Sequence, residues 1–329
     1  MSAAYAHIAM VTKASNGDLM EREKLDIRVM SAISRYFKYC ELGSISPDYS
    51  YLAFWAKLTF QGNENIWSDK MHYEKTGEFI HLGIDKIKEM PESDRKDKCM
   101  AWLFGYAAHM TTDTVIHPIV EKLVGEYATH KYKHRICEMC QDVYIFNKYD
   151  LGKITRCEYF DAGIKTCGST FNLDSDIYEL WNSILNSNYN ELYEINTPNI
   201  HQWHFGFKNC IDMFADNGGI PVISRHTSSG DWFEVTSEKT FKALAFSYPD
   251  KLKKDDEDKY ITKLFTPEGD MTYLKIFEKA LKHVLEIWKF ISDGIYSSSV
   301  EYKTKIKNWD MGTGRNQQTK NFEFWNGEF

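Results

Sequence analysis

Two trios of residues that can bind a metal lie within 34 residues of each other, and each trio has a spacing of four. They are His109, Asp113 and His117 in the first trio and His134, Glu138 and Asp142 in the second. Because an α-helix turns about 100° per residue, a step of four advances only about 40°, so each trio lies along one helix face. Imidazole nitrogens and carboxylate oxygens are ligands of zinc and similar metals. The spacing therefore predicts a metal site supplied by two helices.

The alternative is that these residues have only structural roles. A histidine on a helix is more often a surface or core residue than a ligand, and a nearby carboxylate is usually a solvated partner. Here, however, His109 and Asp113 lie in or beside the apolar stretch 101–108. An unpaired carboxylate is costly to bury there, and a bound metal would remove that cost. We therefore favour the metal site.

Helical periodicity dominates the chain and would position these residues. Apolar residues recur at helical spacing in 19–40, 69–90, 93–117 and 134–146. Pro118 predicts that the third of these helices ends at about His117. Near the C-terminus, Thr266-Pro267-Glu268 predicts the start of a helix that reaches about residue 295. We see no convincing alternating strand pattern, so the predicted fold is all-α.

The signal weakens between residues 150 and 260, where helical patches are predicted at 175–187, 201–215 and 237–247. We expect residues 1–300 to form one helical domain with a variable insertion at 150–260, and residues 301–329 to form a tail. The tail should pack back through Phe322, Phe324, Trp325 and Phe329. Aromatic residues in the insertion suggest a lid or a lipid-facing rim. They are Trp203, Phe205, Phe207, Trp232 and Phe233.

The order of the ligand-type residues resembles that of zinc-dependent phospholipase C. The segments that carry the resemblance are Ala-His-Ile (His7), Ser-Pro-Asp-Tyr (Asp48), Met-His-Tyr (His72), Gly-Tyr-Ala-Ala-His-Met-Thr-Thr-Asp (His109, Asp113), His-Pro (His117) and His-Arg-Ile-Cys-Glu (His134, Glu138). The resemblance covers about residues 1–147, with a weaker echo in the last long helix. Relatives of that family include the catalytic part of glycosylphosphatidylinositol-specific phospholipase D and, more remotely, the S1/P1 nucleases.

The resemblance implies a helical bundle with a zinc cluster in a cleft. Asp48, His72, His109 and Asp113 would hold a first ion, His7 with Asp113 as a bridge a second, and His117, His134 and Glu138 a third. Asp142 would orient a ligand. The family's secreted members also use the amino group of an N-terminal Trp, and this chain has no Trp near its start. We therefore expect two or three zinc ions.

The implied activity is hydrolysis of a phosphodiester in a phospholipid or related amphiphile, with a zinc-activated water attacking phosphorus. Asp48 would orient or deprotonate that water. Tyr49 matches a tyrosine that contacts the choline head group in the family, and Asp69 stands where the family has an aromatic residue. Both are candidate substrate-binding residues, although a packed aromatic explains Tyr49 equally well. A lipid substrate would also bring the protein into peripheral contact with a membrane.

Two other functions remain open. An S1/P1-type nuclease would share the cluster, but those enzymes carry Asp where this chain has Glu138, and the formal charge of −7 argues against binding duplex nucleic acid. A metal-stabilised interaction module would bind zinc without turnover. Cys137-x-x-Cys140 with Cys157 and Cys167 superficially suggests a zinc ribbon, and His201 and His204 a second metal site; ordinary core or surface roles are favoured for both.

The composition and the lack of a visible targeting signal limit where we expect to find the protein. No segment approaches the roughly 20 apolar residues of a membrane span, and no secretory signal is visible. We expect a cytoplasmic protein, or a secreted one if a leader has been removed. The 7 cysteines then fit reduced thiols, and no obligate protein partner is evident.

Overall fold

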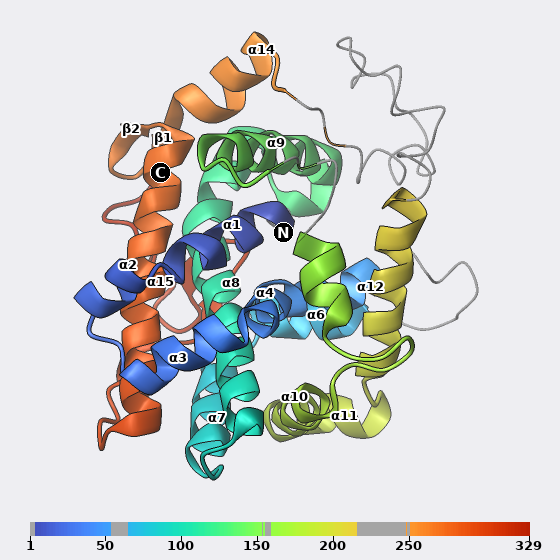
Figure 1. The fold of residues 1–329 in the computed structure, drawn as a ribbon. Helices are drawn as coiled ribbons and strands as arrows, with labels where there is room; N and C mark the ends of the chain where they lie inside the picture. The colour runs from blue at the N-terminus through green and yellow to red at the C-terminus, as the bar shows by residue number, and fades with distance from the viewer. Residues whose placement is uncertain (1–3, 54–64, 153, 155–158, 216–247, 249–250) are drawn as a thin grey trace.

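The computed structural model describes residues 4–53, 65–152, 154, 159–215, 248 and 251–329. These residues form an all-α bundle with two short β-hairpins, as predicted (Figure 1). The helices are α1 (Ala4–Ala14), α2 (Gly17–Arg22), α3 (Ile27–Arg35), α4 (Phe37–Ile45), α5 (Tyr49–Ala53), α6 (Asn65–Tyr73), α7 (Thr76–Lys88), α8 (Asp94–Val124), α9 (Tyr127–Lys148), α10 (Ser175–Asn188), α11 (Asn190–Ile195), α12 (Ile200–Ala215), α14 (Lys254–Glu257), α15 (Tyr273–Tyr296) and α16 (Tyr302–Lys305). No helix among the described residues is long and apolar enough to cross a membrane.

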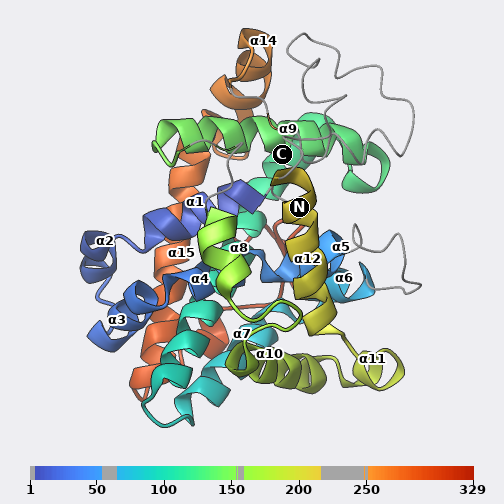
Figure 2. The same ribbon diagram turned by 45° about the vertical axis from the view of Figure 1, so that its right-hand side comes forward.

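The long helix α8 is the centre of the bundle. It is buried from Cys99 to Val120, because neighbouring helices cover it on all sides. Helices α4 and α15 make the most extensive contacts with α8. Figures 1 and 2 show α9 crossing one end of the bundle, and α10 and α11 lying at the other. The residues with metal-binding side chains on α8 therefore lie in the core.

Two glycines allow α4 and α8 to approach closely. A Cβ atom on Gly43 would lie 2.0 Å from the carbonyl oxygen of Trp102, and one on Gly105 would lie 2.0 Å from the carbonyl oxygen of Cys40. No larger residue fits at either position without separating the helices. This close contact brings the carbonyl of Ser44 to the ring of His109, at the distance given below.

Several predicted helix boundaries are wrong. The range 69–90 forms parts of two helices, α6 and α7, with a break at Glu74 and Lys75. Helix α8 continues past Pro118 to Val124, because proline removes only one intrahelical hydrogen bond and the surrounding core keeps the rest of the helix buried. The range 19–40 forms three helices rather than one, with Asp26 capping α3 and a break at Tyr36. Helix α9, which carries the second trio, starts at Tyr127 and is kinked at His130 (φ −127°, ψ 31°), so its straight part begins only a few residues before His134.

The segment Thr266-Pro267-Glu268 is a hairpin turn and not a helix start. Strand β1 (Leu264–Thr266) pairs antiparallel with β2 (Gly269–Met271), with Leu264 opposite Met271. Helix α15 begins after this hairpin, where the hydroxyl of Thr272 accepts the N–H of Lys275. Both threonines are suitable N-caps, so the residue types alone did not separate them.

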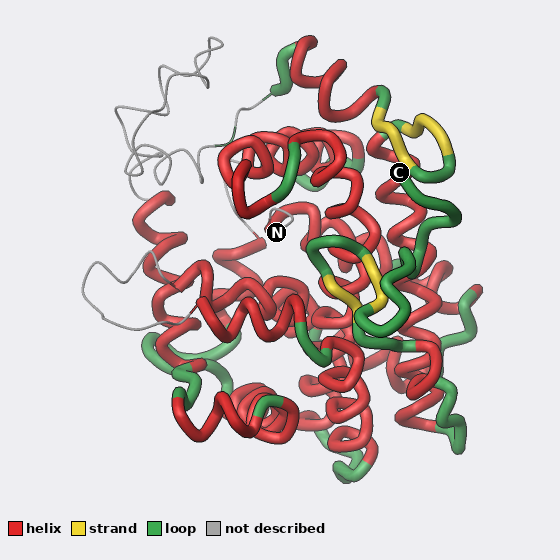
Figure 3. The backbone as a smooth tube through the Cα atoms, turned by 180° about the vertical axis from the view of Figure 1, so that it is seen from behind, coloured by secondary structure: helices red, strands yellow, loops and turns green. Residues whose placement is uncertain are grey.

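The C-terminal tail packs back against the bundle, as predicted. Strand β3 (Trp309–Asp310) pairs antiparallel with β4 (Arg315–Asn316), and Figure 3 shows this hairpin on the back of the bundle. The indole of Trp325 donates to the carbonyl of Val115 on α8 at 2.9 Å. Phe324 lies against Trp309, with 4.9 Å between ring centroids.

Two of the five aromatic residues that suggested a lid or a lipid-facing rim lie in the core instead. Trp203 and Phe207 on α12 are core residues packed against Trp181 and Tyr49, while Phe205 is half-buried beside the exposed Phe171. Trp232, Phe233 and the patch 237–247 lie outside the described residues, as does Cys157. The described cysteines Cys40, Cys99, Cys137, Cys140 and Cys167 are free and buried.

Candidate metal centre

Six of the eight predicted ligands converge in the core from four different parts of the chain. They are His7 on α1, Asp48 at the end of the short turn Ser46–Asp48, His72 near the end of α6, and His109, Asp113 and His117 on α8. The spacing of four on α8 places its three residues on one face, as predicted. All six are at most 4% exposed.

The first set of contacts surrounds one oxygen of Asp113. Its Oδ2 lies 3.3 Å from Nε2 of His109 and 3.9 Å from Nε2 of His72. The two Nε2 atoms are 3.4 Å apart, and Nε2 of His72 is 3.1 Å from Oδ1 of Asp48. Four ligand-type side chains therefore point at one small volume.

The second set of contacts surrounds the other oxygen of the same carboxylate. Oδ1 of Asp113 lies 3.2 Å from Nε2 of His7 and 3.4 Å from Nε2 of His117. The ring of His7 also stacks on His109, with centroids 3.8 Å apart. Asp113 thus faces histidines with each of its oxygens. Among the described residues, two groups of three have ligand atoms that all lie within 4.8 Å of one another: His72 with His109 and Asp113, and His7 with Asp48 and His109.

Backbone carbonyls orient three of the histidine rings. Nδ1 of His72 is 2.7 Å from the carbonyl of Ser68, and Nδ1 of His109 is 2.7 Å from that of Ser44. Nδ1 of His117 is 2.9 Å from the carbonyl of Met311. Since a carbonyl can only accept, each Nδ1 carries a proton, and each Nε2 is the atom that faces the cluster and binds a metal when it is unprotonated. This is how proteins orient histidines that bind metals.

The geometry fits zinc. A tetrahedral ion with bonds of about 2.0–2.1 Å separates its ligand atoms by about 3.3 Å, close to most of the contacts above. Among the described residues, the ring nitrogens of His7 and Oδ1 of Asp48 are buried without a hydrogen bond of good geometry, and Nε2 of His7 and Oδ1 of Asp48 lie 3.1–3.2 Å from another candidate ligand. Buried polar atoms are rarely left without partners, and a bound cation would satisfy these.

The electrostatics agree with that fit. Burial opposes ionisation of Asp113, but the imidazoles of His117, His109 and His7 outweigh it and hold the pKa of Asp113 well below its usual range. Burial likewise opposes ionisation of Asp48, and its histidine neighbours outweigh this and lower its pKa. Burial lowers the pKa of His117 well below its usual range. The two carboxylates are therefore charged, which is the form that binds a metal.

The remaining two predicted ligands lie outside both groups. Nε2 of His134 contacts the carbonyl of Gly125 rather than another ligand, which leaves Nδ1 as its free lone pair. Glu138 follows one turn later on α9 and is buried, and burial raises its pKa to about 7. Among the described residues, His134 and Glu138, like His117, belong to neither group of three whose ligand atoms lie within 4.8 Å of one another.

Asp142 holds the start of α1. Its Oδ1 accepts the N–H of Ala6, the residue before His7, at 2.7 Å. Its Oδ2 accepts the hydroxyl of Tyr248 at 2.8 Å, and Arg135 donates to that same hydroxyl at 3.2 Å. The prediction that Asp142 orients a ligand is consistent with these contacts. Sequence reasoning missed Tyr248, since a lone tyrosine in the insertion carries no signal of such a role.

The two candidate substrate-binding residues lie in different environments. Tyr49 is fully buried, with its hydroxyl 3.1 Å from Nδ1 of His204 and its ring against Phe207, so the structure favours a packing role. Asp69 is exposed and accepts the hydroxyl of Tyr51. His201 stacks on Tyr178, whereas His204 contacts Tyr49, so these two histidines lie against different aromatic residues.

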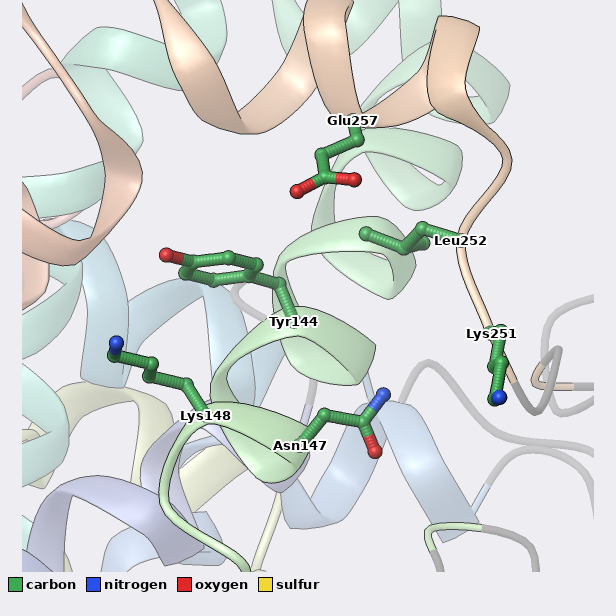
Figure 4. A pocket seen from close by; sticks show the side chains of 6 residues that line it. All are labelled: Tyr144, Asn147, Lys148, Lys251, Leu252 and Glu257. Atoms are coloured by element: carbon green, nitrogen blue, oxygen red, sulfur yellow. The ribbon is translucent and has the colours of Figure 1, made fainter.

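A pocket of about 360 Å³ lies elsewhere on the surface. Figure 4 shows it between the end of α9 and the segment before α14. Its lining residues are Tyr144, Asn147, Lys148, Lys251, Leu252 and Glu257. None of the candidate ligands lines it. At the cluster itself, the exposed area belongs mainly to Asp48 and His117, whose side chains are each 6% exposed, while Asp113, His7 and His109 are fully covered.

A comparison with protein families finds one match, to the model described as zinc dependent phospholipase C, over residues 6–194. The match includes every candidate ligand and extends beyond the residues that carried the resemblance. Comparisons with curated proteins and with solved structures gave no match.

Proposed function

The chain belongs to the zinc-dependent phospholipase C family, and from this premise we propose that its buried cluster binds zinc and hydrolyses a phosphodiester bond of a phospholipid or related amphiphile. Membership of this family indicates a zinc-dependent hydrolase of the phospholipase C type. The observation that supports the proposal is the position of Asp113, whose two oxygens each face two histidines at 3.2–3.9 Å.

We assign the ligands from these contacts. Asp48, His72, His109 and Oδ2 of Asp113 would hold one ion, and Oδ1 of Asp113 with His7 would hold a second. His117 would join the second ion only after its ring moves closer to His7, because these two residues with Asp113 do not have all their ligand atoms within 4.8 Å of one another. His134, through Nδ1, and Glu138 would join an ion on the open side of His117 only after a change in their side chains.

The chain's own residues prepare the site for hydrolysis. Zinc, when bound, supplies a Lewis acid that acidifies water and offsets the charge of a phosphoryl group. Asp48 lies at the exposed edge of the cluster and is ionised, so its carboxylate can orient a water or accept its proton. The backbone carbonyls keep the Nε2 atoms of His72, His109 and His117 aimed inward, so no ligand has to rotate when a substrate enters.

The experiment is a hydrolysis assay with short-chain phosphatidylcholine and phosphatidylethanolamine, single-stranded DNA and a chromogenic phosphodiester, before and after chelation. The proposal predicts release of phosphorylated head group, loss of activity on chelation and recovery with added zinc. DNA cleavage without lipid hydrolysis would establish the nuclease instead. Zinc binding with no turnover on any of these would establish a non-catalytic module.

The role of Asp48 has its own test. Asp48→Asn keeps the side-chain shape but removes the charge, and we expect turnover to fall by about 10²–10⁴ even when zinc is added to saturation. A variant with full zinc content and wild-type turnover would exclude Asp48 as the residue that orients or deprotonates the water.

A further inference from the structure

The last part of the chain contacts the metal-centre helices although it lies outside residues 6–194 of the family match. We call residues 306–325 the C-terminal strap. It contains the hairpin β3–β4 and runs across the back of the bundle (Figure 3). Its contacts join three helices, α6, α7 and α8, two of which carry candidate ligands.

Met311 makes the central contacts. It is fully buried, and its N–H donates to the carbonyl of His72 at 3.0 Å. Its own carbonyl accepts the Nδ1 proton of His117 at 2.9 Å. A single residue of the strap is therefore bonded to one candidate ligand on α6 and to another on α8.

The strap is fastened on both sides of Met311. Before it, the side chain of Asn308 accepts the N–H groups of Gly77 and Glu78 at the start of α7, at 3.0 and 3.1 Å. These are two of the N–H groups that a helix start leaves without intrahelical partners. After it, the amide of Gln317 donates to the carbonyl of Tyr73, the last residue of α6, at 3.0 Å.

A third attachment lies on α8 near its proline. Pro118 has no N–H to donate to the carbonyl of Thr114. Gly314 of the strap packs against this turn of the helix. A Cβ atom on Gly314 would lie 2.5 Å from the carbonyl oxygen of Thr114 and 2.3 Å from Cγ of Pro118. Gly314 also has a φ of +70°, where a side chain is strained.

We propose that the C-terminal strap is part of the metal centre, and that the carbonyl of Met311 positions His117 beside Oδ1 of Asp113 for an ion on that side of the carboxylate. The inference rests on the proposed zinc ligands. The carbonyl fixes which nitrogen of His117 carries the proton and makes Nε2 a better ligand. Loss of such a partner typically weakens metal binding by about 10–100-fold. The ion at Asp48 and His72 depends less on the strap, because the ring of His72 is held by Ser68 within α6.

The experiment compares two substituted glycines. Gly314→Ala introduces strain and displaces the strap from α8. Gly269→Ala, in the turn of β1–β2, introduces similar strain at a φ of +99°, but no atom lies within 4 Å of its new Cβ, so it is the matched control. Trp325→Phe is a second test variant, because it keeps an aromatic ring and removes the bond to Val115.

Zinc affinities are measured by titrating the zinc-free proteins against a chromogenic chelator, with circular dichroism to follow helix content. We expect Gly314→Ala and Trp325→Phe to keep one ion at wild-type affinity and to bind another about 10–100-fold more weakly. Gly269→Ala should match the wild type. With ¹⁵N-labelled histidine and zinc bound, the Nδ1–H signal of His117 should shift in the two test variants, while those of His72 and His109 stay.

The outcomes separate the two proposals. If the wild type binds zinc and both test variants bind every ion as it does, the strap inference is wrong and the proposed function stands. If Gly314→Ala does not fold, Trp325→Phe decides. A wild type that binds no zinc overturns the proposed function and the inference together.

Discussion

Replacing Asp113 by Asn tests the bridging arrangement, because this residue faces both proposed ions. Asp113→Asn preserves the shape of the side chain and removes its charge. Breaking a buried charged contact costs about 3–5 kcal/mol, which corresponds to about two to four orders of magnitude in affinity. Because Oδ2 faces His109 and Oδ1 faces His7, we expect this loss for two ions at once.

The assay is elemental analysis of zinc after dialysis, with affinities from chelator competition. Two matched variants calibrate the result. Asp48→Asn removes a ligand from the first ion only, and His7→Gln removes one from the second only. We therefore expect each to lose about one zinc per chain where Asp113→Asn loses two. A folded Asp113→Asn protein that loses only one ion, or none, would refute the bridge.

Three other substitutions probe the structure around the cluster. Tyr248→Phe removes a hydrogen bond to Asp142, and we expect it to lower the free energy of unfolding in urea by about 1 kcal/mol. Burial raises the pKa of Glu41 from 4.5 to about 8, so the folded protein keeps a proton that the unfolded chain loses as pH rises between these values. Stability should therefore fall over this range, and Glu41→Gln should remove the slope and stabilise the protein at pH 8 by at most about 5 kcal/mol. Gly105→Ala should cost about 1–3 kcal/mol or more in thermal unfolding, because its Cβ would meet the carbonyl of Cys40.

Each of these has a clear contrary result. A Tyr248→Phe protein as stable as the wild type would mean that the hydroxyl does not hold Asp142. Equal pH slopes for wild type and Glu41→Gln would show that this carboxyl ionises near its ordinary pKa. A Gly105→Ala protein with unchanged melting temperature would mean that α4 and α8 are less closely packed than described.

Local patterns predicted the face of α8 correctly. A spacing of four is a property of a single helix, so it places His109, Asp113 and His117 together without knowledge of the rest of the fold. The same reasoning paired His134 with Glu138 on α9, but it could not tell that the ring of His134 contacts the carbonyl of Gly125. That contact depends on the loop between α8 and α9.

The other ligands could not be predicted from spacing. Asp48 follows α4, which packs closely on α8 through Gly43 and Gly105, and His72 comes from α6, which contacts the turn Ser46–Asp48; both are tertiary contacts. Their assignment came from the family resemblance alone. Met311 was not predicted at all, since the groups it uses are its N–H and carbonyl, which every residue but proline has. Aromatic residues predicted only that the tail packs back.

Helix ends were the weakest predictions for a related reason. Pro118 and Thr266-Pro267 are strong local signals, but the buried surroundings of α8 and the pairing of β1 with β2 outweigh them. In each case a contact with a distant segment decided the boundary. The all-α class was predictable because it depends on many helical segments together. An error at the end of one helix does not change it.

Anomalous X-ray scattering at the zinc edge, from crystals of the protein purified without added zinc, tests the central claim most directly. We predict one peak among Asp48, His72, His109 and Oδ2 of Asp113, and a second beside Oδ1 of Asp113 and Nε2 of His7. Zinc peaks on both sides of the Asp113 carboxylate would establish the bridged centre. No peak there after soaking with zinc, or peaks only at other residues, would contradict it.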